Sequence, residues 1–538
     1  MIKYKLRIFF LFQLLICYSV QCQSNNKPNI ILIVADDLGY SDLGCYGGEI
    51  NTPALDKLAN EGLRFPNMYN AGMCVISRSS LLTGQWWPKV GYGIKKGANI
   101  TQKLKETGYR TGLIGKWHLN GIPNDKGFDY FFGFVGGFSS YFNGSRGENG
   151  YYLNKQPFTD FGDNFYSTDA FTNHAIDFIA PKKQNNKEPF FLYLSYQSPH
   201  NPLQAPKEDI LKHRGNYLKG WQAIREARIK KQIQLGIVSP DTPLPAYPKN
   251  LPDWESLSPE QKDMEDLRMS VYAAMVELMD EGIGKLLSAL ETNGQLDNTL
   301  ILFMSDNGTD SFSVMDSEML KRGLLPGDVG SNYQPGTGWA YASVTPNRLY
   351  KISQHNGGVK TGAIAYWPKG IQKQGTIITE PLHVVDIAPT LLEASKYSKN
   401  SLEHLNAYAG QSMATLFSGK KFKRKSPLFF QFKDNRAIRT KTCSLVEVDG
   451  SGWELYNLQK DPLETNDLAK KRKNKVHELN NTWLSWWKKE SNEKNYTPES
   501  TATSKHYKPQ GDRGTGKKYI PTAMPIALKT RYQKEQTD

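Results

Sequence analysis

The sequence predicts an α/β protein, with a large, mainly parallel sheet sandwiched by helices and a smaller antiparallel α+β domain toward the C-terminus. Three continuous apolar segments, rich in β-branched and aromatic residues, have the composition of strands buried on both faces. They cover residues 29–35, 190–196 and 299–305, and residues 362–367 form a candidate fourth strand. Strands that alternate with helices along a chain indicate a mainly parallel sheet.

The segments between these strands carry helical periodicity. The clearest helix covers residues 264–290, where apolar side chains recur at helical spacing, and a shorter one covers residues 53–62. Residues 200–264 are long, polar and rich in Lys, Arg and Pro, which predicts an insertion with one basic helix at 221–235. This insertion either contributes to substrate recognition or is a solvated surface. Short strands joined by turns are predicted over residues 427–458.

These patterns divide the chain into four parts. We predict a signal peptide over residues 1–24, a large domain over 25–425, a small C-terminal domain over 426–495 and a basic tail over 496–538. The tail combines excess Lys and Arg with Thr, Ser, Pro and Gly, so we expect it to extend over the surface.

The composition excludes a disordered or fibrous protein and indicates an anionic partner. The chain has 538 residues, of which 39% are hydrophobic, and 67 Lys and Arg against 53 Asp and Glu give a net charge of +14. Such a surplus favours nucleic acid, anionic lipid, or a sulfated or phosphorylated substrate. The sequence contains no nucleic-acid-binding motif, so we expect no nucleic-acid partner.

The N-terminus indicates export. Lys3, Lys5 and Arg7 precede an apolar run over residues 8–16, which is the pattern of a secretory signal peptide. The run is shorter than the roughly 20 residues that span a bilayer, and no other stretch is long and apolar enough. Lipid attachment at Cys22 stays open, although the residues before it fit a lipobox poorly. The three cysteines after cleavage make no disulfide framework.

Polar side chains follow three of the predicted strands. Asp36 and Asp37 end the first strand, His200 follows the second, and Asp306 and Asn307 end the third. Ligands bind at the carboxyl edge of open α/β sheets, so we expect a shared site there. The four Asp and Asn side chains offer only oxygen atoms, which suit Ca²⁺ or Mg²⁺ better than Zn²⁺.

A cysteine segment adds a candidate nucleophile. Cys74 begins the peptide Cys74-Val75-Ile76-Ser77-Arg78, and the residues after it indicate the start of a helix. A nucleophile at a helix N-terminus gains from the positive end of the helix dipole when it attacks an anion. Taken alone, the segment favours a buried structural cysteine.

The ordered set of motifs resembles the type I, formylglycine-dependent sulfatases of the alkaline phosphatase superfamily, nearest to bacterial arylsulfatases and polysaccharide sulfatases. The Cys74 peptide is similar to the family's Cys-x-Pro-Ser-Arg signature, and the resemblance covers roughly residues 27–470. The matching segments are residues 27–39, 74–84, 115–119, 198–202, 305–308, 348–351, 357–360, 367–370 and 453–464.

The resemblance implies roles for the matching residues. In this family the signature cysteine is oxidised to formylglycine, so a maturation enzyme becomes an expected partner and position 74 an expected nucleophile. The resemblance also implies Ca²⁺ rather than Mg²⁺. The implied metal ligands are Asp36, Asp37, Cys74, Asp306 and Asn307, and the other implied catalytic residues are Arg78, Lys116, His118, His200 and Lys351.

Each implied role has its own chemistry. Arg78 would hold the modified residue and the ligand carboxylates, while Lys116 and Lys351 would bind sulfate oxygens as point charges. His118 would accept the proton when sulfate is expelled, and His200 would protonate the leaving alkoxide.

The substrate inference goes beyond the motifs. Export, positive charge and 12% aromatic residues favour a sulfated polysaccharide or its oligosaccharides, such as ulvan or carrageenan. His213 and Arg214 in the insertion, and His355 and Lys360 near Lys351, are candidate substrate contacts. The sequence determines neither the sugar, the sulfate position, endo or exo action, nor the oligomeric state.

One departure from the family pattern keeps two rival functions open. Ile76 stands where the family usually has Pro, and the maturation enzyme reads this segment as an extended peptide. The rivals are a phosphodiesterase or phosphonate hydrolase of the same superfamily, and a non-catalytic glycan-binding protein in which Cys74 stays unmodified.

Overall fold

The structure is a computed structural model of the chain. It describes residues 27–95, 97, 99–145, 150–181, 188–396, 407–448, 450–491, 493, 496 and 518–533. The predicted signal peptide and most of the predicted tail lie outside these residues.

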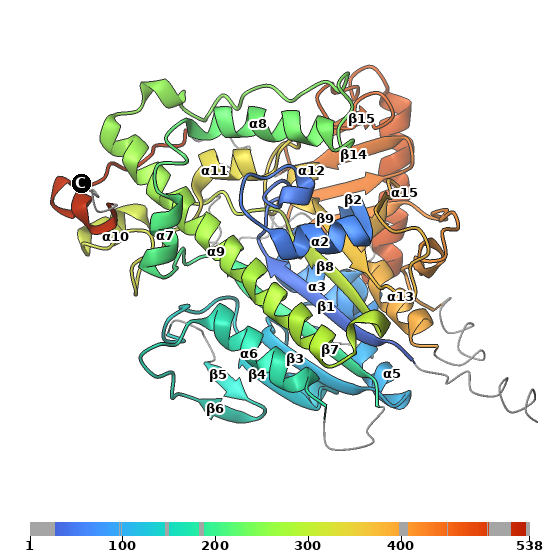
Figure 1. Cartoon of the computed structure of the whole chain (residues 1–538). Coiled ribbons are helices and arrows are strands. Elements are labelled where there is room, and N and C mark those ends of the chain that lie inside the picture. Colours follow the sequence, from blue (N-terminus) through green and yellow to red (C-terminus); the bar gives the residue numbers. More distant parts are fainter. Residues whose placement is uncertain are drawn as a thin grey trace, which may run out of the picture.

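A sheet of eleven strands forms the centre of the molecule, in the order β10-β2-β9-β8-β1-β7-β3-β4-β5-β6, with β11 also pairing with β2 (Figure 1). Its strands are β1 Asn29–Asp36, β2 Leu63–Tyr69, β3 Arg110–Lys116, β4 Tyr130–Phe134, β5 Tyr151–Leu153, β6 Gln156–Phe158, β7 Phe190–Pro199, β8 Thr299–Ser305, β9 Lys360–Tyr366, β10 Thr376–Ile377 and β11 Leu382–His383. The three predicted apolar strands, β1, β7 and β8, are adjacent and parallel, and β1 lies between the other two.

Helices cover both faces of this sheet, which explains the continuous apolar strands. In β1, Ile31 and Ile33 pack into one hydrophobic cluster, while Ile30 and Leu32 pack into another on the opposite face. The first cluster includes side chains of α2 Pro53–Glu61, α6 Ser167–Ile179 and α9 Pro259–Thr292, and the second includes side chains of α3 Cys74–Thr83, α5 Ile100–Glu106 and α13 Ile387–Ala394. The predicted helix over 264–290 is therefore α9, which a capping box at Ser258 starts earlier.

The candidate fourth strand is β9, which is antiparallel to both of its neighbours, β2 and β8. The sheet is therefore mixed, with mostly parallel strands. Because β9 runs against β8, its first residue, Lys360, lies at the same edge of the sheet as the end of β8 at Ser305.

The predicted basic helix of the insertion is α8 Gly220–Gln234, but it does not solvate a surface on all sides. Its Trp221, Arg225 and Arg228 side chains are buried. The other short helices are α4 Trp87–Val90, α7 Lys207–His213, α10 Asp316–Lys321, α11 Gly336–Ser343 and α12 Asn356–Val359. The 3-10 turns are η1 Gly44–Tyr46, η2 Pro123–Lys126, η3 Trp254–Ser256, η4 Leu296–Asn298, η5 Val384–Asp386 and η7 Ala414–Leu416.

A separate antiparallel sheet forms the core of the predicted C-terminal domain. Its strands are β12 Leu428–Phe432, β13 Asn435–Arg439, β14 Cys443–Glu447 and β15 Trp453–Asn457, and α15 Lys473–Ser491 packs on it through Trp483, Trp486 and Trp487. The indole of Trp87 in α4 donates to the Gln431 carbonyl (2.8 Å), which joins the two domains.

The described part of the tail returns to the large domain. It ends in η8 Ile526–Tyr532, which lies beside α7 and α10, far from α15 in Figure 1. Tyr519, Met524 and Tyr532 are buried, and the Tyr519 hydroxyl donates to Glu265 (2.9 Å). This segment is anchored rather than simply extended over the surface.

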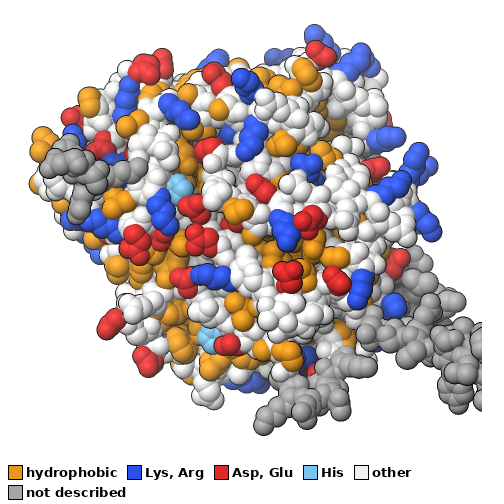
Figure 2. Space-filling model, in the orientation of Figure 1, with side chains coloured by type: hydrophobic (Ala, Val, Ile, Leu, Met, Phe, Trp, Pro, Cys, Tyr) orange, Lys and Arg blue, Asp and Glu red, His pale blue; other side chains and the backbone are white. Residues whose placement is uncertain are grey.

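No helix within the described residues is long and apolar enough to cross a membrane. Cys45, Cys74 and Cys443 are all free thiols. On the face shown in Figure 2, Lys and Arg side chains are prominent along the right-hand edge, where the C-terminal domain lies.

Candidate active site

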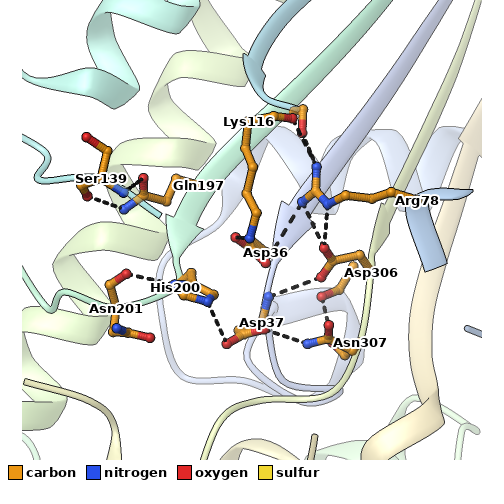
Figure 3. Close-up of polar contacts among 12 residues, drawn as sticks. Asp36, Asp37, Arg78, Lys116, Ser139, Gln197, His200, Asn201, Asp306 and Asn307 are labelled. Atoms are coloured by element: carbon orange, nitrogen blue, oxygen red, sulfur yellow. Dashed lines mark hydrogen bonds and ion pairs between the residues drawn. The ribbon is translucent and has the colours of Figure 1, made fainter. Parts of the chain in front are cut away.

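The residues predicted for the shared site meet at the carboxyl edge of the central sheet (Figure 3). Asp36 ends β1 and Asp37 follows it, Lys116 ends β3, His200 follows β7, and Asp306 follows β8. Parallel strands bring their carboxyl ends to one edge, so residues far apart in sequence become neighbours there. The cluster is buried, and Asp36, Asp37, Lys116, Asp306 and Asn307 each expose no more than 1% of their surface.

Arg78 of α3 contacts the ends of several strands. Its Nε donates to Asp306 Oδ2 (2.9 Å), and its Nη2 lies 2.8 Å from the same oxygen and 3.9 Å from Asp36 Oδ1. Nη1 donates to the Lys116 carbonyl (3.2 Å) and to the Ser195 hydroxyl. Burying a guanidinium is costly unless it is paired, and these carboxylates provide the pairing. The predicted contact of Arg78 with the ligand carboxylates is therefore present.

Two lysines face the remaining carboxylate oxygens. Lys116 Nζ forms an ion pair with Asp36, and Lys351 Nζ lies 2.7 Å and 2.8 Å from the two oxygens of Asp37. Burial lowers the pKa of Lys351, but the negative charge of Asp37 outweighs it and holds the pKa well above its usual range. Lys351 therefore stays a cation over the whole physiological pH range.

The two histidines lie on either side of this group. His200 Nε2 is 3.6 Å from Asp37 Oδ2, and its Nδ1 contacts the Asn201 carbonyl at 2.7 Å. The Nδ1 of His118 is buried and has no hydrogen-bond partner within the described residues. Burial lowers the pKa of both imidazoles, and at His200 the carboxylates of Asp36 and Asp37 oppose this shift. A neutral imidazole can accept a proton, which suits the role predicted for His118.

The backbone is strained around these side chains. Asp37, His118, Leu349 and Ile352 all adopt positive φ angles, between 55° and 81°, although none is glycine. Such conformations cost about 1–3 kcal/mol each and persist where the surrounding structure enforces them. Here they turn Asp37 and His118 into the cluster and place Lys351 between two strained residues.

The cluster offers a set of oxygen atoms that fits a hard divalent cation. Ligand atoms of Asp36, Cys74 and Asp306 lie within 4.8 Å of one another, and so do those of Asp36, Asp37 and His200. Asp36 Oδ1 and Asn307 Oδ1 are buried without a hydrogen-bond partner in the described part of the chain. Buried carbonyl and carboxylate oxygens without partners are costly, and a cation would satisfy them.

The electrostatics of the two central carboxylates differ. Burial acts to raise the pKa of Asp36, but positive charge at His200, Lys116 and Arg78 lowers it below its usual value. Burial and the negative charge of Asp36 raise the pKa of Asp306 to about 7. A cation bound between Asp36 and Asp306 would favour the ionised form of both carboxyl groups.

Cys74 occupies the first turn of α3, as the sequence predicts. Met73 precedes the helix in an extended conformation without a side-chain cap, and Cys74 itself is 1% exposed. Burial raises the pKa of the thiol, although Lys116 and Lys351 oppose the shift. An unmodified Cys74 is thus a poor nucleophile near pH 7, because the thiolate is the reactive form.

Ile76 has a packing role in the folded protein. Its side chain is fully buried and packs with Ala71, Ile352 and Phe432 in a small hydrophobic cluster. The residue that departs from the family signature therefore helps to join α3 to the Lys351 loop and to the C-terminal sheet.

Sequence reasoning missed several polar residues of the site. Asp310 lies within the electrostatic reach of Lys351, and burial raises its pKa to about 6. Ser195 and Tyr193 both accept from Arg78, and Gln197 exchanges hydrogen bonds with the Ser139 backbone (Figure 3). Ser195 and Gln197 are polar residues at the end of an apolar strand, and that was the available signal.

Two of the predicted substrate contacts are committed to other partners. His213 Nε2 contacts Glu277 at 2.8 Å, and Arg214 forms ion pairs with Asp263 and Asp266. These contacts fix α7 to α9, and neither residue joins the cluster. The insertion residues Arg225 and Arg228 also have intramolecular partners, in the carbonyls of Tyr341 and Pro346 and the carboxylates of Asp42 and Glu49.

The other two predicted contacts also lie outside the cluster. His355 Nε2 contacts Glu454 of β15 at 2.8 Å, which links the Lys351 loop to the C-terminal domain. Lys360 lines a different cavity, between the sheet edge and the C-terminal domain.

A mainly parallel sheet with buried acids, lysines and a helix-borne cysteine at its carboxyl edge is typical of an enzyme with an α/β fold that acts on an anionic substrate. Comparison with known proteins makes this class specific. The family model Sulfatase matches residues 28–397, and the model N-sulphoglucosamine sulphohydrolase, C-terminal, matches residues 350–488.

Individual relatives agree with these models. The chain is 34% identical to an arylsulfatase of Klebsiella aerogenes over 70% of this chain and 88% of that one. It is 33% identical to an uncharacterized sulfatase of Schizosaccharomyces pombe over 87% of this chain and 94% of the other. The crystal structure of Ps i-CgsB in complex with k-i-k-neocarrahexaose is 27% identical, with a TM-score of 0.65 over 88% of this chain and 96% of that one.

The chain therefore belongs to the sulfatase family and is a sulfuric ester hydrolase with an alkaline phosphatase-like fold and a C-terminal domain.

Proposed function

We propose that the protein is an exported sulfatase that hydrolyses sulfate esters of a sulfated polysaccharide or its oligosaccharides, with formylglycine made from Cys74 and a bound Ca²⁺ ion. The observation that carries the proposal is the buried cluster in which Asp36, Asp306 and Cys74 converge beside two lysines. A carrageenan-type substrate is the choice within this class, because a similar structure holds k-i-k-neocarrahexaose.

Calcium is the cation that the donor set favours. Asp36, Asp37, Asp306, Asn307 and the modified position 74 would hold it, and all the side-chain donors of the four Asp and Asn residues are oxygens. When bound, such an ion lowers the pKa of the attacking hydroxyl and polarises the sulfate oxygens.

The chain's own residues then have distinct tasks. Lys116 and Lys351 neutralise negative charge where the sulfate oxygens would lie, and Arg78 orients the carboxylates. His200, beside Asp37, donates a proton to the leaving oxygen. His118, with its free buried Nδ1, accepts the proton when sulfate leaves.

The modification at Cys74 is tested directly by mass spectrometry. The peptide containing Cys74, from protein made in its native host, should be about 18 Da lighter than the thiol form. The side chain CH2–SH becomes CHO, so one sulfur and two hydrogens are lost and one oxygen is gained. An unmodified peptide in fully active protein would contradict the proposed nucleophile. An unmodified peptide in inactive protein would instead favour a glycan-binding role.

The metal is tested separately. Chelation should abolish hydrolysis of a small aryl sulfate, and Ca²⁺ should restore it. Full activity in metal-free protein, or zinc found at the site by elemental analysis, would contradict the assignment of calcium.

A further inference from the structure

A second cavity lies between the catalytic sheet and the C-terminal domain, with a volume of about 640 Å³. It is bounded by the ends of β2 and β9, by the loops around residues 379–381 and 422–428, and by the end of β13. None of the residues of the catalytic cluster lines it. Six cations but only one carboxylate, Glu380, contribute to its lining; the cations are Lys360, Lys423, Arg424, Lys425, Arg439 and Lys441.

Arg439 is the more deeply buried of the two cations at the base of this cavity, with 3% of its surface exposed. Its Nη2 donates to Glu464 (2.8 Å) and to the Gln354 carbonyl (2.9 Å). Its Nε and Nη1 are buried without a hydrogen-bond partner in the part of the chain that the structure describes. A buried guanidinium with two unused N–H groups has donors to offer to a ligand.

Lys360 is the second buried cation, with 7% of its surface exposed. Within the described residues its ammonium group forms no hydrogen bond or ion pair, and it lies 5.3 Å from the centre of the Tyr40 ring. Glu464 is nearby, but its two oxygens already accept from Arg439, Ser444 and the Asn356 amide. Burial, with the positive charge of Arg439, lowers the pKa of Lys360 to about 8.

The rim of the cavity adds positive charge. Lys423, Lys425 and Lys441 are exposed there, whereas Arg424 is neutralised by its ion pair with Asp386. Burying a cation without an anion costs stability, and the unpaired Lys360 beside the unused N–H donors of Arg439 is an arrangement that can bind an oxyanion.

We propose that this cavity is a second anion-binding site, which holds a sulfate group on a sugar unit other than the one being cleaved. Lys360 and the free N–H groups of Arg439 bind the sulfate oxygens, and the rim lysines attract the polyanionic chain. The choice of a saccharide as carrier rests on the proposed function, whereas the binding of an oxyanion follows from the cavity itself.

The position of the cavity supports a substrate that extends beyond the catalytic cluster. Lys360 begins β9 and pairs with Tyr69 at the end of β2, and β9 is the neighbour of β8, which ends at the catalytic Asp306. Neighbouring strands lie about 4.8 Å apart, so β2 and β8 are separated by roughly 10 Å at this edge. A chain bound at the catalytic centre reaches the cavity by continuing along the sheet edge.

Equilibrium binding tests the proposal without requiring turnover. Titration calorimetry would compare a sulfated carrageenan oligosaccharide and inorganic sulfate on the Cys74→Ala protein, alone and combined with Lys360→Met or with Lys441→Met. Lys57→Met on the exposed face of α2 is the matched control, because it removes the same charge outside the cavity. Thermal unfolding would show that each variant is folded.

Lys360→Met should weaken oligosaccharide binding by about tenfold or more, the range expected for one hydrogen bond to a charged group. Lys441→Met should weaken it less, and Lys57→Met should leave it unchanged. Binding that depends on Lys360 for inorganic sulfate alone would overturn the saccharide assignment and make the cavity a site for the free ion. Equal binding by all variants, or an equal loss in the Lys57 control, would overturn the site.

These outcomes are independent of catalysis. Hydrolysis of a small aryl sulfate by protein with Cys74 intact tests the proposed function by itself, because that substrate has no second sulfated sugar. An inactive protein that still binds the oligosaccharide through Lys360 would refute the proposed function and support the second site.

Discussion

At the scale of single residues, the site brings together buried charged side chains, whose desolvation lowers the stability of the fold. Asp36, Asp37, Arg78, Lys116 and Asp306 are all almost completely buried, and each is paired with an opposite charge. Buried ion pairs add little net stability, because desolvation offsets the attraction. Such a concentration of buried charge is therefore typical of a catalytic site.

Substitution of His200 or Lys351 tests the roles of acid and of charge stabiliser. His200→Ala and Lys351→Ala should each reduce kcat by at least about 10²-fold, the usual scale for such losses. The loss for His200→Ala should shrink with an aryl sulfate whose phenolate leaves easily, because such a leaving group needs little protonation. Steady-state kinetics on two aryl sulfates, with exposed Lys369→Ala as control, measures both effects. Equal losses on good and poor leaving groups would argue against an acid role for His200.

Lys360 predicts a pH dependence of anion binding. Its pKa is lowered to about 8, so the amine loses its proton as the pH rises through 8 and binds an anion less well. The groups that face it are Arg439, Glu464, Tyr40 and Tyr69, and burial keeps the pKa of Tyr69 at about 12, outside this window. Oligosaccharide affinity of the Cys74→Ala protein should therefore fall between pH 7 and 9. The same titration on Lys360→Met should lack this step, and a step of equal size there would assign it to another group.

The lowered pKa of Lys360 also makes the free energy of unfolding depend on pH. A lysine whose pKa is lower in the folded than in the unfolded state binds fewer protons when folded, so burial of Lys360 destabilises the fold most below pH 8. The penalty disappears as the pH rises toward the ordinary lysine pKa of 10.5. A bound sulfate would offset it, because an anion raises the pKa again.

At the scale of secondary-structure elements, the insertion after His200 supports the catalytic loop. Arg228 of α8 pairs with Asp42 and Glu49, and Arg225 donates to the carbonyls of Tyr341 and Pro346. Asp42 also accepts from the Gly39 amide, in the loop that follows the ligand residues of β1. The basic helix therefore fixes the loop behind Asp37 instead of contacting a sugar.

Removal of the Arg228 side chain should show this structural role. Arg228→Met leaves Asp42 buried without its cation, and breaking a buried pair in this way costs about 3–5 kcal/mol. Lys230→Met, an exposed position on the same helix, should change the free energy of unfolding by less than about 0.5 kcal/mol. Chemical denaturation compares the two. Equal stability of both variants would refute the structural role of Arg228.

At the scale of the whole molecule, the chain closes on itself through its C-terminal segment. Residues 518–533 lie against the insertion and α9, on the opposite side of the molecule from α15 (Figure 1). The Met524 amide donates to the Glu260 carbonyl (2.9 Å), and Arg531 pairs with Asp328. The segment covers apolar side chains, including Trp221, that the insertion would otherwise expose.

Deletion of residues 518–538 should destabilise the large domain without removing catalytic groups. Each of the three buried side chains, Tyr519, Met524 and Tyr532, contributes about 1.5–3 kcal/mol by burial. The midpoint of thermal unfolding should fall by a few degrees, while hydrolysis of an aryl sulfate persists at low temperature. Ile526→Ala, at a position that is 83% exposed, should leave the midpoint unchanged. An unchanged midpoint after deletion would show that the segment does not support the fold.

The sequence by itself determined the strands that form the centre of the sheet and the residues that stand at their ends. Continuous apolar segments identify doubly buried strands without any knowledge of their neighbours, and parallel pairing then brings Asp36, His200 and Asp306 to one edge. The ordered motifs added Cys74, Arg78, Lys116 and Lys351, and the structure brings all of them to the same cluster.

Only the tertiary structure decided what the other charged residues do. His213, Arg214 and Arg228 look like surface groups in the sequence, but each contacts a carboxylate from another element. Lys360 looks the same and is left unpaired beside a cavity. Local patterns report periodicity and burial, whereas the charge that faces a side chain comes from other elements of the chain, 49 residues away for Arg214 and its partner Asp263 and 186 for Arg228 and its partner Asp42. The partners of a lysine or arginine therefore become known only when the chain has folded.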